Sequence, residues 1–275
     1  DQVAGGSAGN TVACLASLGG SAAFIGKVAD DELGAVYKNS METLGVKFIS
    51  NYDTTGTPTG RCLIAVTPDA ERSMATFLGA AGNIVESDIH EDDITSAAIV
   101  YFEGYQFDAP GARKAFIKAC QIAHAAGRKT ALTLSDVGVV ERNREDLVQV
   151  IRDHVDLLFA NEDEARALFG THETPAQLAA EMAKLSPYGA VTRSERGSVV
   201  YGPDQPVHEV EAFKPSQLVD TTGAGDAYAG GFLYGFARDM PLDQCARLGS
   251  MAATEVISHM GPRPEVSLKD LAQEK

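Results

Sequence analysis

The sequence predicts an α/β protein with a doubly wound, mostly parallel sheet flanked by helices and a small β-sheet lid. Three observations support this prediction. From residue 97 onward, short apolar segments alternate with amphipathic helical segments, which is the order expected of a parallel sheet with crossover helices. These apolar segments are continuous, as is typical of strands that are covered on both faces. Residues 46–79, by contrast, contain extended segments with no helical pattern between them.

The beginning of the chain combines helices and strands. Helical spacing over 10–19 ends at a Gly-Gly pair, and 30–45 is an amphipathic helix that starts with acidic residues and ends at Gly45. The predicted strands here are 22–28, 46–50, 59–67 and 72–79, with turns at DTTGTP and PDAE. We therefore predict a β-rich lid over 46–79 and a main domain formed by 1–45 and 80–275.

The rest of the chain alternates strand and helix. The predicted strands are 97–104, 129–135, 155–161, 189–193, 198–202 and 207–212. The predicted helices between them are 110–127, 143–154, 162–170 and 176–185. This order places ligand-binding loops at the carboxyl ends of the strands.

Charge and cysteine usage exclude several classes of function. The net charge of −15 and the absence of any basic run argue against nucleic acid as a partner. No apolar stretch reaches the roughly 18 residues that a membrane span needs, and no signal peptide is visible. The cysteines lack the spacing of metal ligands, so we expect reduced core residues in a cytoplasmic protein. They are Cys14, Cys62, Cys120 and Cys245.

The segment DTTGAGDAYAGGFLYGF, residues 220–236, places Gly223 and Gly225 where an apolar helix begins. Glycine costs about 1 kcal/mol in a helix interior relative to alanine, so its use here needs a reason. Glycines at a helix start let backbone N–H groups point at one anion, and the helix adds its positive partial charge. The segment is not a Walker A loop, because GxxxxGK[ST] is absent. It predicts an anion-binding loop suited to a phosphoryl group in transfer.

Asp226 follows this loop directly. A carboxylate beside an anion site would repel phosphate, but it is useful if it takes a proton from a hydroxyl that attacks phosphorus. General-base help of this kind is worth roughly 10²–10⁴-fold in rate. The alternative is that Asp226 only stabilises the helix start through the helix dipole. Spacing alone leaves both interpretations open.

DTTGAGDAYAGGFL resembles the C-terminal signature of the PfkB, or ribokinase-like, family of carbohydrate and nucleoside kinases. Residues 5–34, GGSAGNTVACLASLGGSAAFIGKVADDELG, resemble the N-terminal signature of the same family. NEDEA, residues 161–165, matches its N-x-x-E motif. The similarity runs in order from Gly5 to GPRP at 261–264 and implies a ribokinase-like fold.

The resemblance implies roles for the residues of the glycine-rich loop. Asp226 matches the catalytic base, and Gly223, Ala224 and Gly225 match the backbone anion hole. Asp220 matches a position near a monovalent-cation site, with K⁺ as the candidate ion, and Thr222 matches a nucleotide contact.

The resemblance also implies an acceptor site. Gly5, Gly6 and Asn10 match positions that hold sugar hydroxyls, with a helix-entry turn as the alternative interpretation. Glu103, at a strand end, matches a carboxylate that contacts the sugar. The 46–79 strands resemble a lid that closes over the sugar and excludes water.

Two further motifs match the nucleotide site of the family, which uses ATP and Mg²⁺. Asn161 and Glu164 match residues that orient magnesium and phosphates, usually through water, although Asn161 is also a good helix N-cap. Thr192 and Gly197 match a nucleotide loop of the pattern T-x-G-x-x-G, in which Ser194 replaces the first glycine.

The sequence departs from the family at its beginning. Family members start with a strand that carries an Asp upstream of the Gly-Gly pair, and no such strand is present here. We therefore expect that an N-terminal segment of the natural protein is missing.

Within the family, TGRCLIAVTPDAERSMATFLGAAGNI, YFEGY and GPRP look most like bacterial adenosine kinases. This implies transfer of the γ-phosphoryl group of ATP to the 5′-hydroxyl of adenosine, which gives AMP. Tyr105 or Phe102 is a candidate wall for stacking a base. The alternatives are a kinase of a free sugar (ribose, fructose or 2-keto-3-deoxygluconate) and a non-catalytic nucleoside-binding module. The expected partner is thus a small molecule, and a homodimer is compatible with the resemblance.

Overall fold

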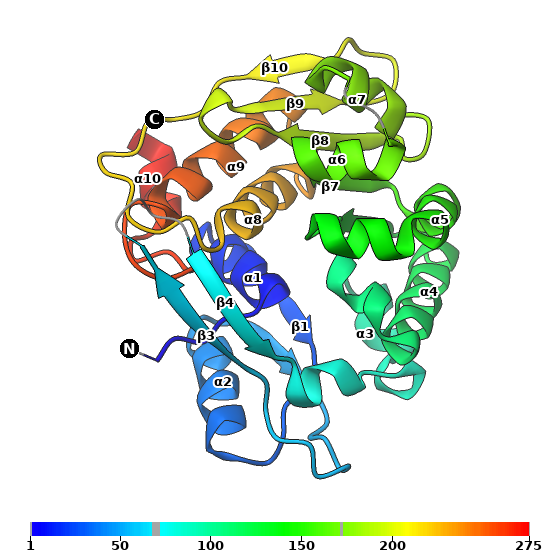
Figure 1. Ribbon diagram of the computed structural model, residues 1–275, viewed down its shortest axis with the longest axis vertical. Helices are drawn as coiled ribbons and strands as arrows, with labels where there is room; N and C mark the ends of the chain where they lie inside the picture. Colours follow the sequence, from blue (N-terminus) through cyan, green and yellow to red (C-terminus); the bar gives the residue numbers. More distant parts are fainter. Residues whose placement is uncertain (1, 68–71, 171–172, 275) are drawn as a thin grey trace. The chain divides into compact units, whose positions relative to one another are not determined.

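The computed structural model describes residues 2–67, 72–170 and 173–274 (Figure 1). Its contacts divide the chain into two compact units, which we describe separately. Unit 1 comprises Asp1–Ile84, Phe213–Tyr234 and Leu248–Lys275; unit 2 comprises Val85–Ala212 and Gly235–Arg247. The predicted PDAE turn at 68–71 lies outside the described residues. The predicted division of the chain at residues 45 and 79 stays a prediction.

Unit 2 is built on a six-stranded sheet with the order β10-β9-β8-β7-β6-β5. The strands are β5 (Ile99–Glu103), β6 (Lys129–Thr133), β7 (Leu157–Asn161), β8 (Tyr188–Thr192), β9 (Ser198–Tyr201) and β10 (His208–Val210). β5 to β8 pair in parallel, whereas β9 and β10 are antiparallel to their neighbours. Leu132, Leu158 and Val191, on the central strands, are fully buried. The predicted fold class, with a mostly parallel sheet of continuous apolar strands, is confirmed.

The helices of unit 2 include α3 (Glu91–Thr95), α4 (Pro110–Ala125), α5 (Val137–His154), α6 (Glu162–Phe169) and α7 (Pro175–Met182). Three of them, α5, α6 and α7, begin at a residue whose side chain caps the helix. Figure 1 shows α6 beside β7 and β8, and contacts join α4 to β5 and β6 and α7 to β8 and β9. α5 starts earlier than the predicted 143, because the Asp136 carboxylate accepts a hydrogen bond from the Val139 N–H at 3.2 Å. The helix then passes a non-helical Asn143, which hid its first turns in the sequence pattern.

Unit 1 gathers helices from both ends of the chain. Its elements are α1 (Ser7–Ser17), β1 (Ala23–Ile25), α2 (Glu32–Thr43), β2 (Lys47–Ile49), β3 (Arg61–Val66), β4 (Arg72–Phe77), α8 (Ala224–Phe236, to Tyr234), α9 (Leu242–Val256, from Leu248) and α10 (Leu268–Glu274). A buried cluster includes Cys14 of α1, Leu18 at the C-cap of α1, Ala227 of α8, Met251 of α9 and Leu268 of α10. The first helix of the chain therefore shares one apolar core with three helices near the other end of the chain.

Two glycines explain how α8 fits between its neighbours. A Cβ added at Gly230 would lie 2.5 Å from the Thr11 carbonyl oxygen of α1. A Cβ added at Gly231 would lie 2.5 Å from the Leu248 carbonyl oxygen of α9. Glycine is unfavourable inside a helix, but here it allows two helix backbones to approach α8 closely.

The strands of the 46–79 region form two separate pairs. β3 and β4 form an antiparallel two-stranded sheet, the small lid sheet that the sequence predicts. β2 instead pairs in parallel with β1, so this strand does not join the lid sheet. Leu63 and Met74 of the lid sheet are 75% and 52% exposed, because a two-stranded sheet buries few of its side chains. In the part of the chain that the structure describes, no helix is long and apolar enough to cross a membrane.

A substitution of Phe116 tests the packing of the unit 2 core. Phe116 is 1% exposed, and its ring lies 4.2 Å from that of Phe102 and 5.5 Å from that of Phe107, centroid to centroid. We expect Phe116→Ala to lower the free energy of unfolding by about 3–5 kcal/mol, because a cavity remains. Urea denaturation measures this change, with Tyr52→Ala, at a 40% exposed aromatic residue, as control. A loss under about 1 kcal/mol would contradict this description of the core.

Candidate functional site

Asp226 lies in the first turn of α8 and is hydrogen-bonded at both carboxylate oxygens. The Ser7 hydroxyl donates to Oδ1 at 2.6 Å, and the Asn10 side-chain amide donates to Oδ2 at 2.9 Å. Both donors come from the first turn of α1, and Asn10 is 4% exposed. Asp226 itself is half-buried. The carboxylate is therefore held in one orientation by a helix from the other end of the chain.

The loop before Asp226 requires glycine at one position and leaves the backbone open at the next. Gly223 has a φ of +79°, and a Cβ added there would lie 2.7 Å from Cβ of Pro262. Gly225 is exposed, and a Cβ there would meet nothing within 4 Å. The first N–H groups of a helix have no partners within the helix, so they can bind an anion at this open backbone. This geometry fits the phosphate group that the sequence predicts here.

Asp220 stabilises the start of the same loop. Its Oδ1 accepts hydrogen bonds from the Thr222 N–H at 2.9 Å and the Thr222 hydroxyl at 2.6 Å. Its Oδ2 accepts one from the Gly261 N–H at 3.0 Å. Asp220 is 3% exposed and Thr222 is 7% exposed. Both thus have a structural role in the loop, and the predicted cation and nucleotide contacts stay predictions.

Of the predicted acceptor residues near the N-terminus, Asn10 contacts Asp226 directly. Gly6 is the N-cap of α1 with a φ of +85°, and its carbonyl accepts the Asn10 N–H at 2.9 Å. Gly5 has open space around it, since an added Cβ would meet nothing within 4 Å. The structure thus brings Gly6, Asn10 and Asp226 together, and the helix-entry turn considered as an alternative is also present.

Sequence reasoning missed two side chains of this site. Ser7 stands between the predicted residues Gly6 and Asn10, and a serine at a helix start gave no separate signal. Arg263 lies in the GPRP segment, whose resemblance to the family assigns it no role. Its Nη1 donates to the Ser40 hydroxyl at 2.9 Å, and its Nε donates to Oδ1 of Asn10 at 3.5 Å. The guanidinium also lies 5.8 Å from the ring centroid of Tyr37.

Apart from Thr222, the predicted nucleotide residues belong to unit 2, where Asn161 and Thr192 lie at the carboxyl ends of β7 and β8. Asn161 pairs with Thr192 in the sheet register. The Asn161 side chain accepts the Glu164 N–H at 2.8 Å, and Glu164 accepts the Asn161 N–H at 3.0 Å and its amide at 2.9 Å. This reciprocal cap begins α6. Burial raises the pKa of Glu164 to about 7, although the hydrogen bond from the Asn161 backbone opposes the shift.

Two residues of the predicted nucleotide loop have a positive φ. Ser194 has a φ of +53°, in the left-handed region that favours glycine, which is the residue of the family motif at this position. Gly197 has a φ of +79°, and an added Cβ would lie 2.0 Å from the Val210 carbonyl oxygen. Arg196 forms an ion pair with Glu162, the first residue of α6. Loop and helix start are therefore joined.

Glu103 ends β5 and is 6% exposed. The Ser135 hydroxyl donates to its Oε2 at 3.1 Å and accepts the Gly104 N–H at 2.8 Å. Phe102 packs in the core against Phe116, so the structure corrects its assignment as a stacking wall for a base. Tyr105, the other candidate, is 46% exposed and its hydroxyl donates to the Ser135 carbonyl.

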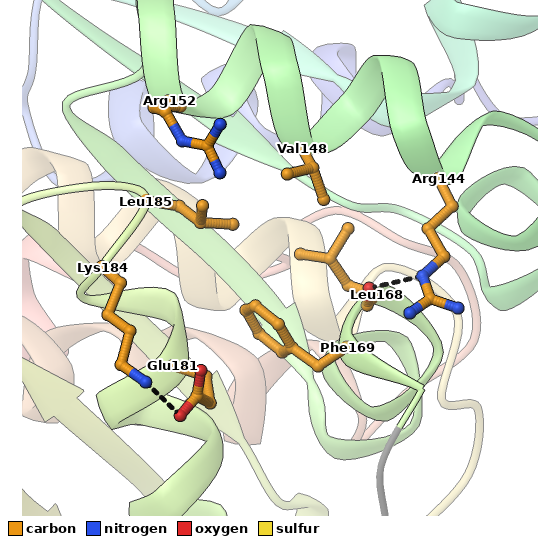
Figure 2. Close-up of a pocket in the computed structure, with 8 residues that line it drawn as sticks. All are labelled: Arg144, Val148, Arg152, Leu168, Phe169, Glu181, Lys184 and Leu185. Atoms are coloured by element: carbon orange, nitrogen blue, oxygen red, sulfur yellow. Dashed lines mark hydrogen bonds and ion pairs between the residues drawn. The ribbon is translucent and has the colours of Figure 1, made fainter.

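A pocket of about 320 Å³ lies elsewhere in unit 2 (Figure 2). Its lining residues are Arg144, Val148, Arg152, Leu168, Phe169, Glu181, Lys184 and Leu185. Figure 2 shows that two of its cations are engaged, Lys184 with Glu181 and Arg144 with the Leu168 carbonyl. No predicted site residue lines it, so this pocket is not the candidate site.

Asn161 and Glu164 at the start of α6 fit the binding of a hydrated magnesium ion. Within residues 2–67, 72–170 and 173–274, no three His, Cys, Asp or Glu side chains gather as metal ligands. Mg²⁺ keeps several waters and is usually bound by one or two carboxylates together with substrate phosphates. Glu164, with both oxygens bound to Asn161, would therefore act on such an ion through water.

Comparisons with known proteins agree with the fold. Residues 1–268 match the family described as pfkB family carbohydrate kinase. The adenosine kinase structure from Sinorhizobium meliloti has a TM-score of 0.93 and 45% identity, covering 98% of this chain and 82% of that one. A probable sugar kinase protein from Rhizobium etli CFN 42 has a TM-score of 0.94 and 40% identity, with the same coverage. The cytidine kinase of Thermococcus kodakarensis is 41% identical over 124 residues, 43% of this chain and 42% of its own length.

Because the pKa of Glu164 is raised in the folded protein, we predict that its stability depends on pH. A carboxyl with a raised pKa in the folded state stabilises the fold fully below its unfolded pKa, and this contribution is lost as pH rises through about 7. Between pH 5 and pH 8 we expect the wild type to lose about 2–3 kcal/mol more stability than Glu164→Gln. Urea denaturation at both pH values measures the difference, with Glu195→Gln, at an exposed residue, as control. If the stabilities of wild type and Glu164→Gln changed in parallel with pH, the raised pKa of Glu164 would be refuted.

Proposed function

The chain belongs to the pfkB family of carbohydrate kinases and is an ATP-dependent kinase of a sugar or nucleoside, and we propose that its acceptor is the 5′-hydroxyl of adenosine. The 45% identity to the adenosine kinase from Sinorhizobium meliloti, over almost the whole chain, supports this choice. A free sugar is the second candidate, because the Rhizobium etli protein of similar identity is named a probable sugar kinase.

The observation that carries the proposal is the fixed Asp226 carboxylate at the start of α8. In this proposal Asp226 takes the proton of the acceptor hydroxyl as that hydroxyl attacks phosphorus. Ser7 and Asn10 occupy one carboxylate oxygen each, so the acceptor must share or replace one of these donors. The Ser7 hydroxyl is the donor that can turn away by rotation about a single bond, which would open Oδ1 to the substrate.

The loop from Gly223 to Gly225 binds the transferring phosphoryl group in this proposal. Its backbone N–H groups lie at the positive end of α8, and the Ala224 N–H, which donates to the Thr221 carbonyl at 3.3 Å, would share or exchange that bond for the phosphate. ATP with Mg²⁺, the pair that this family uses, supplies the phosphoryl group and neutralises part of its charge when bound. In this scheme Asp220 fixes the conformation of the loop through its hydrogen bonds with Thr222 and Gly261. We further propose that Asp220 lies near a binding site for K⁺.

We assign the nucleotide contacts of unit 2 on local geometry. Asn161 and Glu164 lie at the N-terminus of α6, where phosphate is favoured, and Thr192 and Gly197 lie in the loop joined to it. Glu103 is proposed to contact the acceptor from the carboxyl end of β5. The lid sheet β3–β4 is proposed to exclude water during transfer, because water competes as an acceptor.

A substrate panel tests the acceptor and the base together. We expect coupled ADP release to be fastest with adenosine, and slower with cytidine, ribose, fructose and 2-keto-3-deoxygluconate. Asp226→Asn should keep the fold and lower kcat by roughly 10²–10⁴-fold. The matched control is Asp243→Asn, which changes an exposed first-turn Asp of α9 and should leave kcat unchanged. Undiminished turnover of Asp226→Asn would eliminate the base assignment, and binding of adenosine without turnover would favour a binding module.

The two loop glycines give a paired test of the anion site. Gly223→Ala places a side chain at a φ of +79° and against Pro262, so we expect a lower melting temperature and a higher KM for ATP. Gly225→Ala meets no neighbouring atom and gains helix propensity, so it should melt at the same or a higher temperature. Equal melting temperatures and equal KM for ATP in the two variants would contradict the description of the loop.

A further inference from the structure

Three consecutive residues after α9 contact three different parts of the candidate site. The Gly261 N–H donates to Asp220 at 3.0 Å. Pro262 lies against Gly223, where an added Cβ would come within 2.7 Å of it. Arg263 reaches Asn10, which in turn holds Asp226. The 261–263 segment is therefore placed to set the geometry of the loop and of the carboxylate at the same time.

The surroundings of Arg263 are built around its guanidinium. Nη1 donates to the Ser40 hydroxyl, and the group lies over the Tyr37 ring, which is a favourable position for a cation. A Cβ added at Gly9 of α1 would lie 2.3 Å from the Tyr37 hydroxyl and 3.2 Å from Nη2 of Arg263. Glycine at position 9 thus leaves the space that these two side chains occupy.

Asn10 lies between a cation and an anion. Its Oδ1 faces Nε of Arg263 at 3.5 Å, and its Nδ2 donates to Oδ2 of Asp226 at 2.9 Å. If the amide turned over, its N–H group would face the guanidinium and its oxygen would face the carboxylate, so both contacts would be repulsive. The long Arg263 contact is weak as a hydrogen bond, but the charge on either side fixes the amide dipole.

A purely structural account explains this arginine poorly. Burial lowers the pKa of Arg263, which means that its surroundings disfavour the charge. An apolar side chain of similar volume at a buried site is often as stable as an ion or more so. A cation beside the Asn10 amide is therefore better explained by what it does to that amide.

We propose that Arg263 is a positioning residue for phosphoryl transfer: it orients the Asn10 amide, which then holds the Asp226 carboxylate toward the acceptor hydroxyl. The inference rests on the proposed role of Asp226 as the base. Arg263 touches neither the acceptor nor the phosphoryl group in this account. Its effect passes through Asn10 alone, and this property makes it testable by a double-mutant cycle.

The experiment measures kcat and KM for adenosine in Arg263→Met, Arg263→Lys, Asn10→Ala and the double variant Arg263→Met/Asn10→Ala. The rates are expressed per folded molecule from near-ultraviolet circular dichroism. We expect Arg263→Met to lower kcat by about 10- to 100-fold, since small misplacement of a reacting group has effects of this size. Arg263→Lys, which keeps the charge, should recover most of kcat. In the Asn10→Ala background, Arg263→Met should lower kcat no further.

Ser40→Ala is the matched control, because it removes a different hydrogen-bond partner of Arg263 and leaves the Asn10 contact in place. Its kcat should stay at the wild-type value. Three results would overturn the proposal. They are a wild-type kcat of Arg263→Met, an undiminished effect of Arg263→Met in the Asn10→Ala background, and an Arg263→Met variant that has no folded fraction. Asp226→Asn separates this failure from that of the proposed function: if it still lowers kcat by roughly 10²–10⁴-fold, only the role of Arg263 is refuted.

Discussion

The pair of hydrogen bonds that Ser7 and Asn10 donate to Asp226 is the interaction on which the candidate site depends. They join residues that are 219 and 216 positions apart in the chain. Neither helix could orient a carboxylate alone, because a first-turn side chain at a helix N-terminus is free to turn toward solvent. The contact requires α1 and α8 to lie close together, and Gly230 allows this approach. The packing of the unit 1 core therefore also places the Asp226 carboxylate.

Unit 2 places polar groups by a different principle. Its parallel strands end at one edge of the sheet, so Glu103, Asn161 and Thr192 reach that edge from β5, β7 and β8. The reciprocal cap between Asn161 and Glu164 then starts α6 at that edge. Here the sheet topology positions the side chains, and local capping fixes their orientation.

Much of the fold could be predicted from the sequence because the signals are local. The predicted strand 155–161 and helix 110–127 correspond to β7 and α4 within two residues at either end. The pairing of β2 with β1 could not be predicted, because two three-residue strands carry no register signal. The start of α5 was missed since its regular spacing breaks at Asn143.

The candidate site was predictable where a residue type is unusual for its place. Gly223 and Asp226 stand out because glycine and a bare carboxylate at a helix start need an explanation. Arg263 does not stand out, since an arginine in a loop is ordinary and its contact with Asn10 spans 253 positions. Phe102 shows the opposite error, because an aromatic residue near a strand end is more often part of the core.

The most direct test of the central claim is a crystal structure with adenosine and a non-hydrolysable ATP analogue. We expect the 5′-oxygen of adenosine within about 3 Å of an Asp226 carboxylate oxygen, with Asn10 still bound to the other oxygen. We also expect the terminal phosphate at the N–H groups of Gly223 to Gly225. An adenosine hydroxyl bound elsewhere, with Asp226 in contact only with Ser7 and Asn10, would contradict this claim.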